Sequence, residues 1–341
     1  MRFNNVYIHA MDYYEPTDVL SSDELEEELT PLYERLKLPK GRLELQTGIK
    51  RRGFFKDLIP SEISTRAAKL ALEKCKIAKE KIDLLIHSSV CRDMLEPSTS
   101  SFIHNNLNLR PHCTSYDLSN ACLGFLNSIL VAGSQIEAGL INNAMVVSGE
   151  NSWALWKETK NFLNTNSNLT RKTVKKYIAN LTIGSMGVAF ILSNNPEGAL
   201  CKIMGGKELC DTSSSHLCQG DGNTQGLMME TESVALLESG IELARKTWGL
   251  TQKELELYSL DHSVGHQVGT AHREALLRNL KLDAKKDHIS FDQFGNTGSA
   301  AAPMTLAYHQ DKFKIHDIIA LLGIGSGLHS VMLGLKWMKD V

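Results

Sequence analysis

The feature that most constrains the fold of this chain is a repeated order of short apolar runs and longer amphipathic segments. In the first half a helical pattern leads into KIDLLIHSSV, and TSYDLSNACLG and AMVVSGE follow. In the second half the same order recurs as LELYSLDHSVGH, HISFDQFGNTGSAAA and IIALLGIGSG. Short apolar runs that alternate with helices are typical of α/β proteins with buried strands. The order predicts two similar halves, with sheets sandwiched between helices.

We predict the extent of each element from its periodicity and its flanking residues. The predicted helices are Ser22–Leu36, Ser61–Lys76, Leu123–Glu137, Glu232–Trp248 and Val268–Leu280. The predicted strands are Leu84–Ser89, Ser115–Leu118, Ala144–Ser148, Gly187–Ser193, Tyr258–Val264, His288–Phe291 and Ile318–Leu322. The polar segment Lys157–Lys176 is predicted to be an exposed helical insertion or flap. No linker divides the chain, and we place the boundary between the halves at residue 195.

The composition excludes several classes of function. The 341 residues are 42% hydrophobic and 22% charged, which is typical of a folded globular protein. There are 37 Lys and Arg residues against 39 Asp and Glu residues, a net charge of −2. This balance gives no general attraction to nucleic acid or to anionic lipid, and the short basic runs Lys50–Arg52 and Arg171–Lys176 are predicted to be solvated faces. We therefore expect no nucleic-acid partner.

The cysteines and the two ends of the chain indicate the compartment. Seven scattered cysteines without a CxxC motif predict free thiols in a reducing compartment. Cys210, His216 and Cys218 are spaced loosely and lack an evident fourth ligand, so we expect no metal site. The N-terminus lacks a signal-peptide pattern, and Ile318–Trp337 contains four glycines, which favours two strands over a membrane span. We expect a cytoplasmic protein with no membrane span.

Cys122 is the first candidate nucleophile. It follows a predicted strand and the small residues Ser119–Ala121, and it opens an apolar helix. A thiol at the N-terminus of a helix lies near unpaired N–H groups, which lower its pKa and favour the thiolate. We therefore expect a thiol pKa below the ordinary value of about 8.5. A buried structural cysteine is the alternative.

His266 and Asn296 are the candidate partners of Cys122. His266 ends a predicted strand, and a loop histidine together with a cysteine is a candidate catalytic couple. The flanking Gly265 and the absence of a glutamate argue against a helical zinc motif with His262. Asn296 lies between Gly295 and Thr297, and its amide could donate to a developing oxyanion without titrating. A structural histidine and a simple turn remain the alternatives.

A glycine-rich segment, Gly323–Gly327, follows a buried strand near the end of the chain. It satisfies neither phosphate-binding motif, because Leu328 and His329 follow. Its backbone N–H groups could instead polarise a thioester carbonyl.

The motifs Asn120-Ala121-Cys122, His266-Gln267 and Gly295-Asn296-Thr297 stand in the order Cys…His…Asn. This order resembles the thiolase superfamily, in particular its ketoacyl synthase III branch, and the resemblance covers essentially the whole chain. It extends from Thr47-Gly48-Ile49 to the closing glycine-rich segment. The resemblance implies a five-layered α-β-α-β-α fold of two pseudo-duplicated halves, residues 1–195 with Cys122 and residues 196–341 with His266 and Asn296. It also implies a homodimer.

Within this branch the segment Arg92–Thr99 and the closing LLGIGSGL resemble the OleA-type enzymes. Members of that group join two fatty acyl-CoA molecules head to head, without decarboxylation, to give a β-keto acid. The resemblance implies that Glu96 reaches the active site of the partner subunit and acts there as a base. Without the resemblance, Glu96 would be interpreted as a surface charge before a proline turn.

The resemblance assigns the other roles as follows. Cys122 takes the acyl group, and the N–H groups of Cys122 and Ser326 form the oxyanion hole. His266 and Asn296 stabilise the enolate oxygen of the second substrate. Arg52 and Gly325 are expected to contact substrate, and coenzyme A thioesters are the substrates with no further cofactor.

Two departures from the family pattern bear on the partner. Initiating synthases usually carry an arginine five positions after the histidine, where this chain has Ala271 and a displaced Arg273. The double arginine Arg51-Arg52 also comes one position early. Both departures weigh against efficient recognition of an acyl carrier protein. The alternatives are a decarboxylating ketoacyl synthase III that uses malonyl carrier protein, a related secondary-metabolite acyltransferase, an acyl-chain binding module and an inactive partner subunit.

Overall fold

The computed structural model describes residues 1–220, 228–266 and 268–340. Its main sheet has the strand order β12-β11-β13-β14-β8-β1-β7-β6-β4-β5. The first half contributes β1 (Tyr7–Tyr14), β4 (Leu84–His87), β5 (Thr114–Asp117), β6 (Asn143–Glu150) and β7 (Met186–Ser193). The second half contributes β8 (Cys201–Cys210), β11 (His262–Gly265), β12 (Asp287–His288), β13 (Ile318–Gly325) and β14 (His329–Trp337).

The two halves of this sheet have the same topology. In the first half β4 pairs in parallel with β5 and β6, and β7 links β6 to β1 by antiparallel pairing. In the second half β11 pairs in parallel with β12 and β13, and β14 links β13 to β8 in the same way. The predicted duplication is therefore confirmed at the level of strand order. The boundary at residue 195 stays a prediction.

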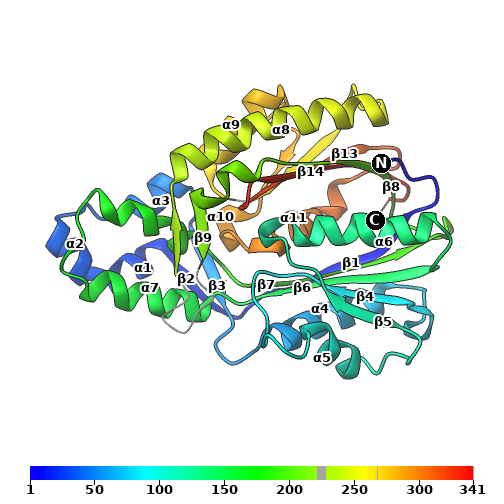
Figure 1. Cartoon of the computed structure of the whole chain (residues 1–341), viewed down its shortest axis with the longest axis horizontal. Helices are drawn as coiled ribbons and strands as arrows, with labels where there is room; N and C mark the ends of the chain where they lie inside the picture. The colour runs from blue at the N-terminus through cyan, green and yellow to red at the C-terminus, as the bar shows by residue number, and fades with distance from the viewer. Residues whose placement is uncertain (221–227, 267, 341) are drawn as a thin grey trace.

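Helices cover both faces of each half-sheet, so that layers of helices and strands alternate in the order α-β-α-β-α (Figure 1). The helices α6 (Gly124–Glu137) and α11 (Ala301–Tyr308) lie between the half-sheets. The helices α4 (Pro60–Lys74) and α5 (Thr99–Asn106) cover the outer face of the first, and α8 (Ser233–Leu255) and α9 (Thr270–Leu280) cover that of the second. The layers are joined at one edge, because β1 pairs with β8 at Tyr7–Lys202 and Ile8–Cys201.

The middle layer is closely packed because the residues that face it are small or apolar. Phe125 of α6 packs edge-on against Phe190 of β7, with ring centroids 5.0 Å apart. A Cβ on Gly323 of β13 would lie 2.7 Å from Leu123 Cδ2 and 2.8 Å from Leu126 Cδ1, so only glycine allows this approach. The glycines of LLGIGSG therefore let a strand lie directly against the helix that follows Cys122.

A separate cap is built mainly from residues 18–54 and 153–182. Its elements are β2 (Asp18–Ser21), α1 (Ser22–Glu28), α2 (Thr30–Leu36), α3 (Arg42–Thr47), β3 (Arg51–Phe54), α7 (Trp153–Thr165) and η3 (Thr173–Thr182). The helix predicted over Ser22–Leu36 is divided at Leu29, because Pro31 fits only the first turn of a new helix.

The prediction of an exposed helical insertion or flap over Lys157–Lys176 is confirmed in part, since more than half of the segment is exposed. The segment is helical, but Trp156, Leu163 and Val174 are buried in the cap with Leu32 of α2. Trp156, Thr159 and Leu163 lie on one face of α7, and this short apolar stripe is diluted by polar neighbours in the sequence.

The remaining elements are short. They are η1 (Lys79–Lys81), η2 (Ala121–Leu123), η4 (Thr212–Leu217), β9 (Cys218–Gly220), β10 (Met229–Thr231), α10 (Phe291–Phe294), η5 (Gly298–Ala300) and η6 (Gln310–Lys312). The glycine-interrupted segment Ile318–Trp337 forms the hairpin of β13 and β14, as predicted. No helix in the described ranges is long and apolar enough to cross a membrane.

Candidate active site

The candidate residues follow the carboxyl ends of two equivalent sets of parallel strands. In the first half the loop that carries Glu96 follows β4, and Cys122 follows β5. In the second half His266 follows β11, Asn296 comes after β12 and α10, and Ser326 follows β13. Carboxyl ends of parallel strands meet at one edge of a sheet, which is where α/β folds bind ligands. The duplication therefore provides two sets of loops for one site.

Cys122 lies in a sharp turn between β5 and α6. Ala121 just before it has a φ of 45°, in the left-handed region that costs a non-glycine residue about 1–2 kcal/mol. Cys122 is in the 3₁₀ turn η2, and α6 begins two residues later. A Cβ on Gly325 would lie 3.7 Å from the Cβ of Cys122. The strained turn therefore presents the thiol directly to the end of β13, where Ser326 begins the next turn.

The surroundings of Cys122 favour its protonated thiol. Burial, together with the nearby Glu150 carboxylate and the Cys218 thiol, raises the pKa of Cys122 to about 12. The predicted lowering of this pKa is therefore wrong for the free protein. The position before α6 favours a thiolate, but the loss of water and the adjacent carboxylate outweigh it.

This protonation state can be tested by alkylation. We expect the rate of Cys122 alkylation by iodoacetamide to rise about tenfold per pH unit without a plateau below pH ~9.5, because the thiolate fraction rises throughout that range. Mass spectrometry of peptides separates Cys122 from the exposed Cys210, which serves as the internal reference. An alkylation rate that reaches a plateau near pH 7 would instead support the predicted thiolate of low pKa.

His266 lies beside β13 and is uncharged. Its backbone N–H donates to the Leu322 carbonyl at 2.8 Å, which continues the pairing of β11 with β13. Burial, together with the nearby His272, lowers the pKa of His266 to about 4. Nδ1 of His266 is buried and has no hydrogen-bond partner among the described residues. A neutral imidazole of this kind can accept a proton. Gln267, the next residue of the predicted motif, lies outside the described part of the chain.

The Asn296 side chain has a fixed orientation. Its backbone N–H donates to Thr182 at 2.8 Å, and its carbonyl accepts from Gly184 at 2.9 Å. Its Oδ1 accepts the N–H of Gly298 at 3.1 Å, which leaves the Nδ2 amide as the group that can donate to a ligand. The turn η5 that follows also contacts η2, which contains Cys122. The segment after Asn296 thus lies beside the turn of Cys122, and the Asn296 amide is oriented as a donor.

Glu96 and Arg52 have opposite surroundings. Glu96 is exposed, between Leu95, which is 88% exposed, and Pro97. Arg52 is completely buried and donates to Ser22 Oγ at 3.0 Å. Arg52 is therefore not placed to contact the nucleotide of a substrate, and that expectation is wrong. The displaced Arg273 is also engaged, since its Nε lies 2.6 Å from Asp287.

Sequence reasoning missed Glu150, the last residue of β6. Its side chain is buried and accepts backbone N–H groups from Val90, Cys91 and Ser299. Burial raises the pKa of Glu150, while the three N–H donors oppose this shift. The available signal was a carboxylate at the end of the apolar run AMVVSGE, where β6 ends beside β4.

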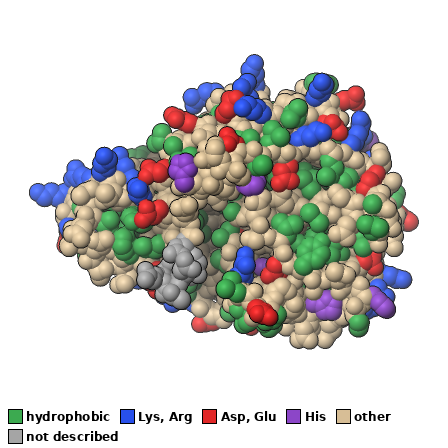
Figure 2. All heavy atoms as spheres, in the orientation of Figure 1, with side chains coloured by type: hydrophobic (Ala, Val, Ile, Leu, Met, Phe, Trp, Pro, Cys, Tyr) green, Lys and Arg blue, Asp and Glu red, His purple; other side chains and the backbone are tan. Residues whose placement is uncertain are grey.

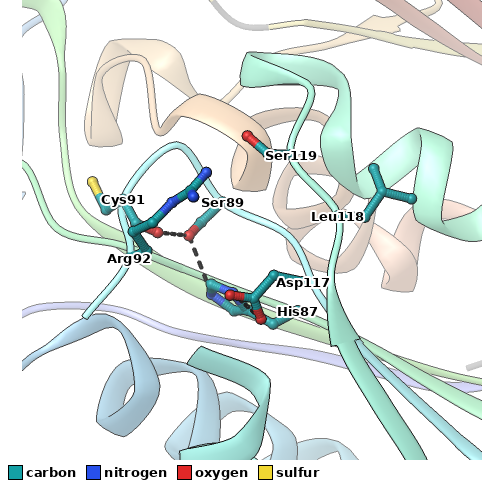
Figure 3. A pocket seen from close by; sticks show the side chains of 7 residues that line it. All are labelled: His87, Ser89, Cys91, Arg92, Asp117, Leu118 and Ser119. Carbon is teal, nitrogen blue, oxygen red and sulfur yellow. Dashed lines mark hydrogen bonds and ion pairs between the residues drawn. The ribbon is translucent and has the colours of Figure 1, made fainter. Parts of the chain in front are cut away.

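A small polar cavity lies next to the loop of Glu96 (Figure 3). Ser89 Oγ lies 3.1 Å from His87 Nε2, and His87 Nδ1 lies 3.5 Å from Asp117. Burial opposes ionisation of Asp117, but hydrogen bonds from His87 and from the N–H groups of Ser100 and Thr99 lower its pKa to about 2. The cavity measures about 10 Å³, which is room for a single water and not for a substrate.

A much larger cavity, of about 400 Å³, lies in the cap between α2, α3 and η3. Its basic lining residues are Arg42, Arg171, Lys172 and Lys175. Its apolar lining includes Leu32, Leu43 and Val174. Lys and Arg side chains gather at this end of the molecule in Figure 2. The helix α3 ends at Gly48, which packs against Thr270 at the start of α9, four residues after His266.

No group of three or more His, Cys, Asp or Glu side chains in residues 1–220, 228–266 and 268–340 is placed to hold a metal.

Known proteins share this architecture. Residues 250–337 match the family described as the C-terminal part of 3-oxoacyl-[acyl-carrier-protein] synthase III. The acyl-CoA:acyl-CoA alkyltransferase of Xanthomonas campestris is 35% identical, over 99% of this chain and 100% of that protein. A β-ketoacyl-[acyl-carrier-protein] synthase III of Clostridioides difficile is 27% identical, over 86% of this chain and 89% of that protein.

The solved structures of Xanthomonas campestris OleA are also similar. The one with bound lauric acid and lauroyl-CoA is 34% identical, with a TM-score of 0.92 over 98% of this chain and 100% of that chain. The same protein was solved with a cysteine, a glutamate or a histidine replaced. There the replaced glutamate precedes the replaced cysteine by as many positions as Glu96 precedes Cys122 here.

Proposed function

The chain belongs to the acyl-CoA:acyl-CoA alkyltransferase family of thiolase-like, ketoacyl synthase III-related acyltransferases, and we propose that it condenses two fatty acyl-CoA molecules without decarboxylation. In the first step Cys122 takes the acyl group of one acyl-CoA and coenzyme A leaves. In the second step the α-carbon of another acyl-CoA attacks this thioester and releases Cys122. Hydrolysis of the resulting β-ketoacyl-CoA gives the β-keto acid.

The observation that carries the proposal is the convergence of Cys122, the His266 loop and Asn296 at equivalent strand ends. We propose that the His266 imidazole accepts the thiol proton as the sulfur attacks; both groups are uncharged before the attack, because burial raises the pKa of Cys122 and lowers that of His266. The proton then goes to the sulfur of the leaving coenzyme A. The N–H groups of Cys122 and Ser326 stabilise the tetrahedral oxyanion, and Gly325 permits the close approach of this turn to the thiol.

The second step needs a base and a stabilised enolate. The Asn296 amide donates a hydrogen bond to the enolate oxygen. His266 donates a second hydrogen bond through the ring N–H of its neutral imidazole. Glu96 removes the α-proton. Because Glu96 is exposed on its own protomer, we propose that it serves the site of the partner in a homodimer.

The edge of the main sheet supports such a dimer. Among the described residues the strand β5 pairs with β4 on one side only and is the last strand of the sheet, so its other edge is available. The loop of Glu96 carries Val90, Met94 and Leu95, which are 48%, 46% and 88% exposed. An isologous contact through β5 and this loop would cover these side chains.

The free state of all seven cysteines supports a reducing, cytoplasmic setting.

We propose that the basic cavity in the cap receives the phosphates of coenzyme A. One coenzyme A molecule carries several negatively charged phosphate groups, and Arg and Lys side chains bind phosphate groups. The chain of contacts from α3 through Gly48 to α9 connects this cavity to the His266 loop.

Replacing Arg42 and Lys175 together with alanine should raise the KM for acyl-CoA about tenfold or more and leave kcat within about twofold, because the lost contacts bind ground state and transition state alike. The salt dependence of KM should become weaker. The exposed Lys69 and Lys285 provide a matched double alanine control on other surfaces. A fall in kcat with an unchanged KM would contradict this assignment.

The alternative is a decarboxylating ketoacyl synthase III, which the similarity to such enzymes favours. The engagement of Arg273 by Asp287 and the alanine at position 271 favour coenzyme A over a carrier protein as the carrier of the second substrate. An inactive partner subunit would not need Cys122, His266 and Asn296 together.

The deciding experiment supplies purified protein with a long-chain acyl-CoA as the sole substrate. We expect mass spectrometry to detect a β-keto acid, or the ketone formed from it by loss of CO₂. Product that appears only after malonyl carrier protein is added would identify the decarboxylating synthase instead. An unmodified Cys122 after incubation would reject both enzymes.

A further inference from the structure

Glu150 is a buried carboxylate held by backbone N–H groups. Its side chain is 3% exposed. Oε1 accepts the N–H groups of Val90 and Ser299, both at 2.9 Å, and Oε2 accepts that of Cys91 at 3.3 Å. In the described ranges no ion pair joins Glu150 to a basic side chain. A buried carboxylate without a basic partner in the described ranges is costly, so its position is informative.

The donors belong to two different loops of the active site. Val90 and Cys91 begin the loop that carries Glu96, after β4. Ser299 lies three residues after Asn296, in the turn η5. Ser299 adds a third connection, because its Oγ accepts the N–H of Phe125 in α6 at 3.0 Å. The Glu150 carboxylate and the Ser299 hydroxyl thus join the three chain segments that carry Glu96, Asn296 and Cys122.

The fit around this carboxylate is close. Gly298 has a φ of 58°, and a Cβ built there would lie 2.8 Å from Glu150 Oε1. Only glycine therefore lets the turn after Asn296 wrap around Glu150. The same Gly298 donates the hydrogen bond that orients the Asn296 amide. A shift of Glu150 would consequently move the orientation of Asn296 as well.

The loop of Glu96 is fixed at its other end too. Asp117 accepts the N–H groups of Thr99 and Ser100, both at 2.8 Å, shortly after Glu96. Ser89 Oγ also donates to the Cys91 carbonyl, as Figure 3 shows. Glu96 itself is exposed between these two anchors. The position of its carboxylate therefore depends on how each end of the loop is held.

We infer that Glu150 is a positioning residue, which holds the loop of Glu96 and the turn of Asn296 in fixed places beside Cys122. The inference rests on the proposed function, since it assigns both loops to the condensation step. Formation of the acyl-Cys122 thioester uses Cys122, His266 and the β13 turn. Disturbing Glu150 should therefore slow carbon–carbon bond formation far more than acylation.

The test is Glu150→Gln. Glutamine keeps the shape and one acceptor oxygen, but its NH₂ group cannot accept an N–H. We expect condensation to slow about 10–100-fold with the KM for acyl-CoA unchanged, because small misplacements of catalytic groups cost rates of this size. Acylation, measured as the mass increase of Cys122, should stay within about threefold. Loss of the charge should also move the pH profile of Cys122 alkylation to lower pH.

The matched control is Glu137→Gln. Glu137 also accepts two backbone N–H groups, those of Asn4 and Asn5 at 2.9 and 2.8 Å, but it lies at the far end of α6. Both steps should be unchanged in this variant. Unchanged condensation in Glu150→Gln would overturn the inference. So would an equal loss of both steps together with a lower melting temperature and an unmoved alkylation profile, which would indicate a role in folding alone.

The proposed function can fail separately from this inference. If wild-type protein makes product only with malonyl carrier protein, the proposed function is wrong. The Glu150→Gln measurements are then repeated in that assay, where the turn of Asn296 still serves condensation. A selective loss there, with the shifted alkylation profile, would support the positioning role, and no selective loss would reject it.

Discussion

Replacing Glu96 with glutamine should leave acylation of Cys122 intact and lower the rate of condensation about 10²–10⁴-fold, the range that removal of a general base produces. Non-decarboxylative condensation needs a base to remove the α-proton of the second acyl-CoA, and an amide cannot accept that proton. Acylation does not involve this proton. Intact-mass measurement of acyl-Cys122 and mass spectrometry of the β-keto acid follow the two steps separately.

Glu197→Gln is the control for this variant, because Glu197 is an exposed glutamate on the connection between β7 and β8, outside the site. It should not change either step. Full condensation in Glu96→Gln would reject Glu96 as the base. Loss of acylation in the same variant would show that Glu96 also supports the first step, against the roles proposed here.

The sequence predicted the parts of the site that depend on strand order. Cys122, the His266 loop and Asn296 each follow a short apolar run, and the repeated order of those runs predicts equivalent positions in a duplicated sheet. The resemblance to condensing enzymes added Glu96, which no local pattern distinguishes from a surface charge. The glycines of the last hairpin were evident, and the structure explains them by the close approach of β13 to Leu123 and Leu126.

Properties that depend on burial were beyond the sequence. Helix position alone predicted a thiolate at Cys122, whereas the surrounding atoms partly bury the thiol and place Glu150 nearby. Arg52 was one of two adjacent arginines, and only the packing of the cap shows that Arg52 is buried while Arg51 is exposed. Glu150 ends an apolar strand, and its importance depends on donors from Val90 and Ser299, which are far from it in the sequence.

The neutral state of both Cys122 and His266 has a consequence for the order of events. An uncharged pair costs less to bury than a thiolate and an imidazolium, so the two side chains can lie partly buried without a large penalty. The proton then moves only when the sulfur attacks a bound thioester. This arrangement limits reaction of the thiol with other electrophiles before the substrate binds.

A dimer made of one Cys122→Ala subunit and one Glu96→Gln subunit should regain about half of the wild-type condensation rate per dimer, because two-fold symmetry leaves one complete site. Each parent variant should be inactive in condensation. If Glu96 serves the partner, the intact Cys122 of the Glu96→Gln subunit receives Glu96 from the Cys122→Ala subunit. If Glu96 serves its own subunit, every site in this dimer lacks one group and the activity stays at the parental level.

Co-expression with two different affinity tags and sequential purification gives the mixed dimer free of both parents. The control is a mixed dimer of wild type and Cys122→Ala, which also has one complete site and should give the same rate. Equality of these two rates is the specific signature of a base supplied across the interface. It follows from the exposure of Glu96 on its own protomer, from the available edge of β5, and from the exposed apolar side chains of Met94 and Leu95 beside it. Activity in the control dimer without activity in the dimer of the two variants would show that Glu96 serves its own subunit.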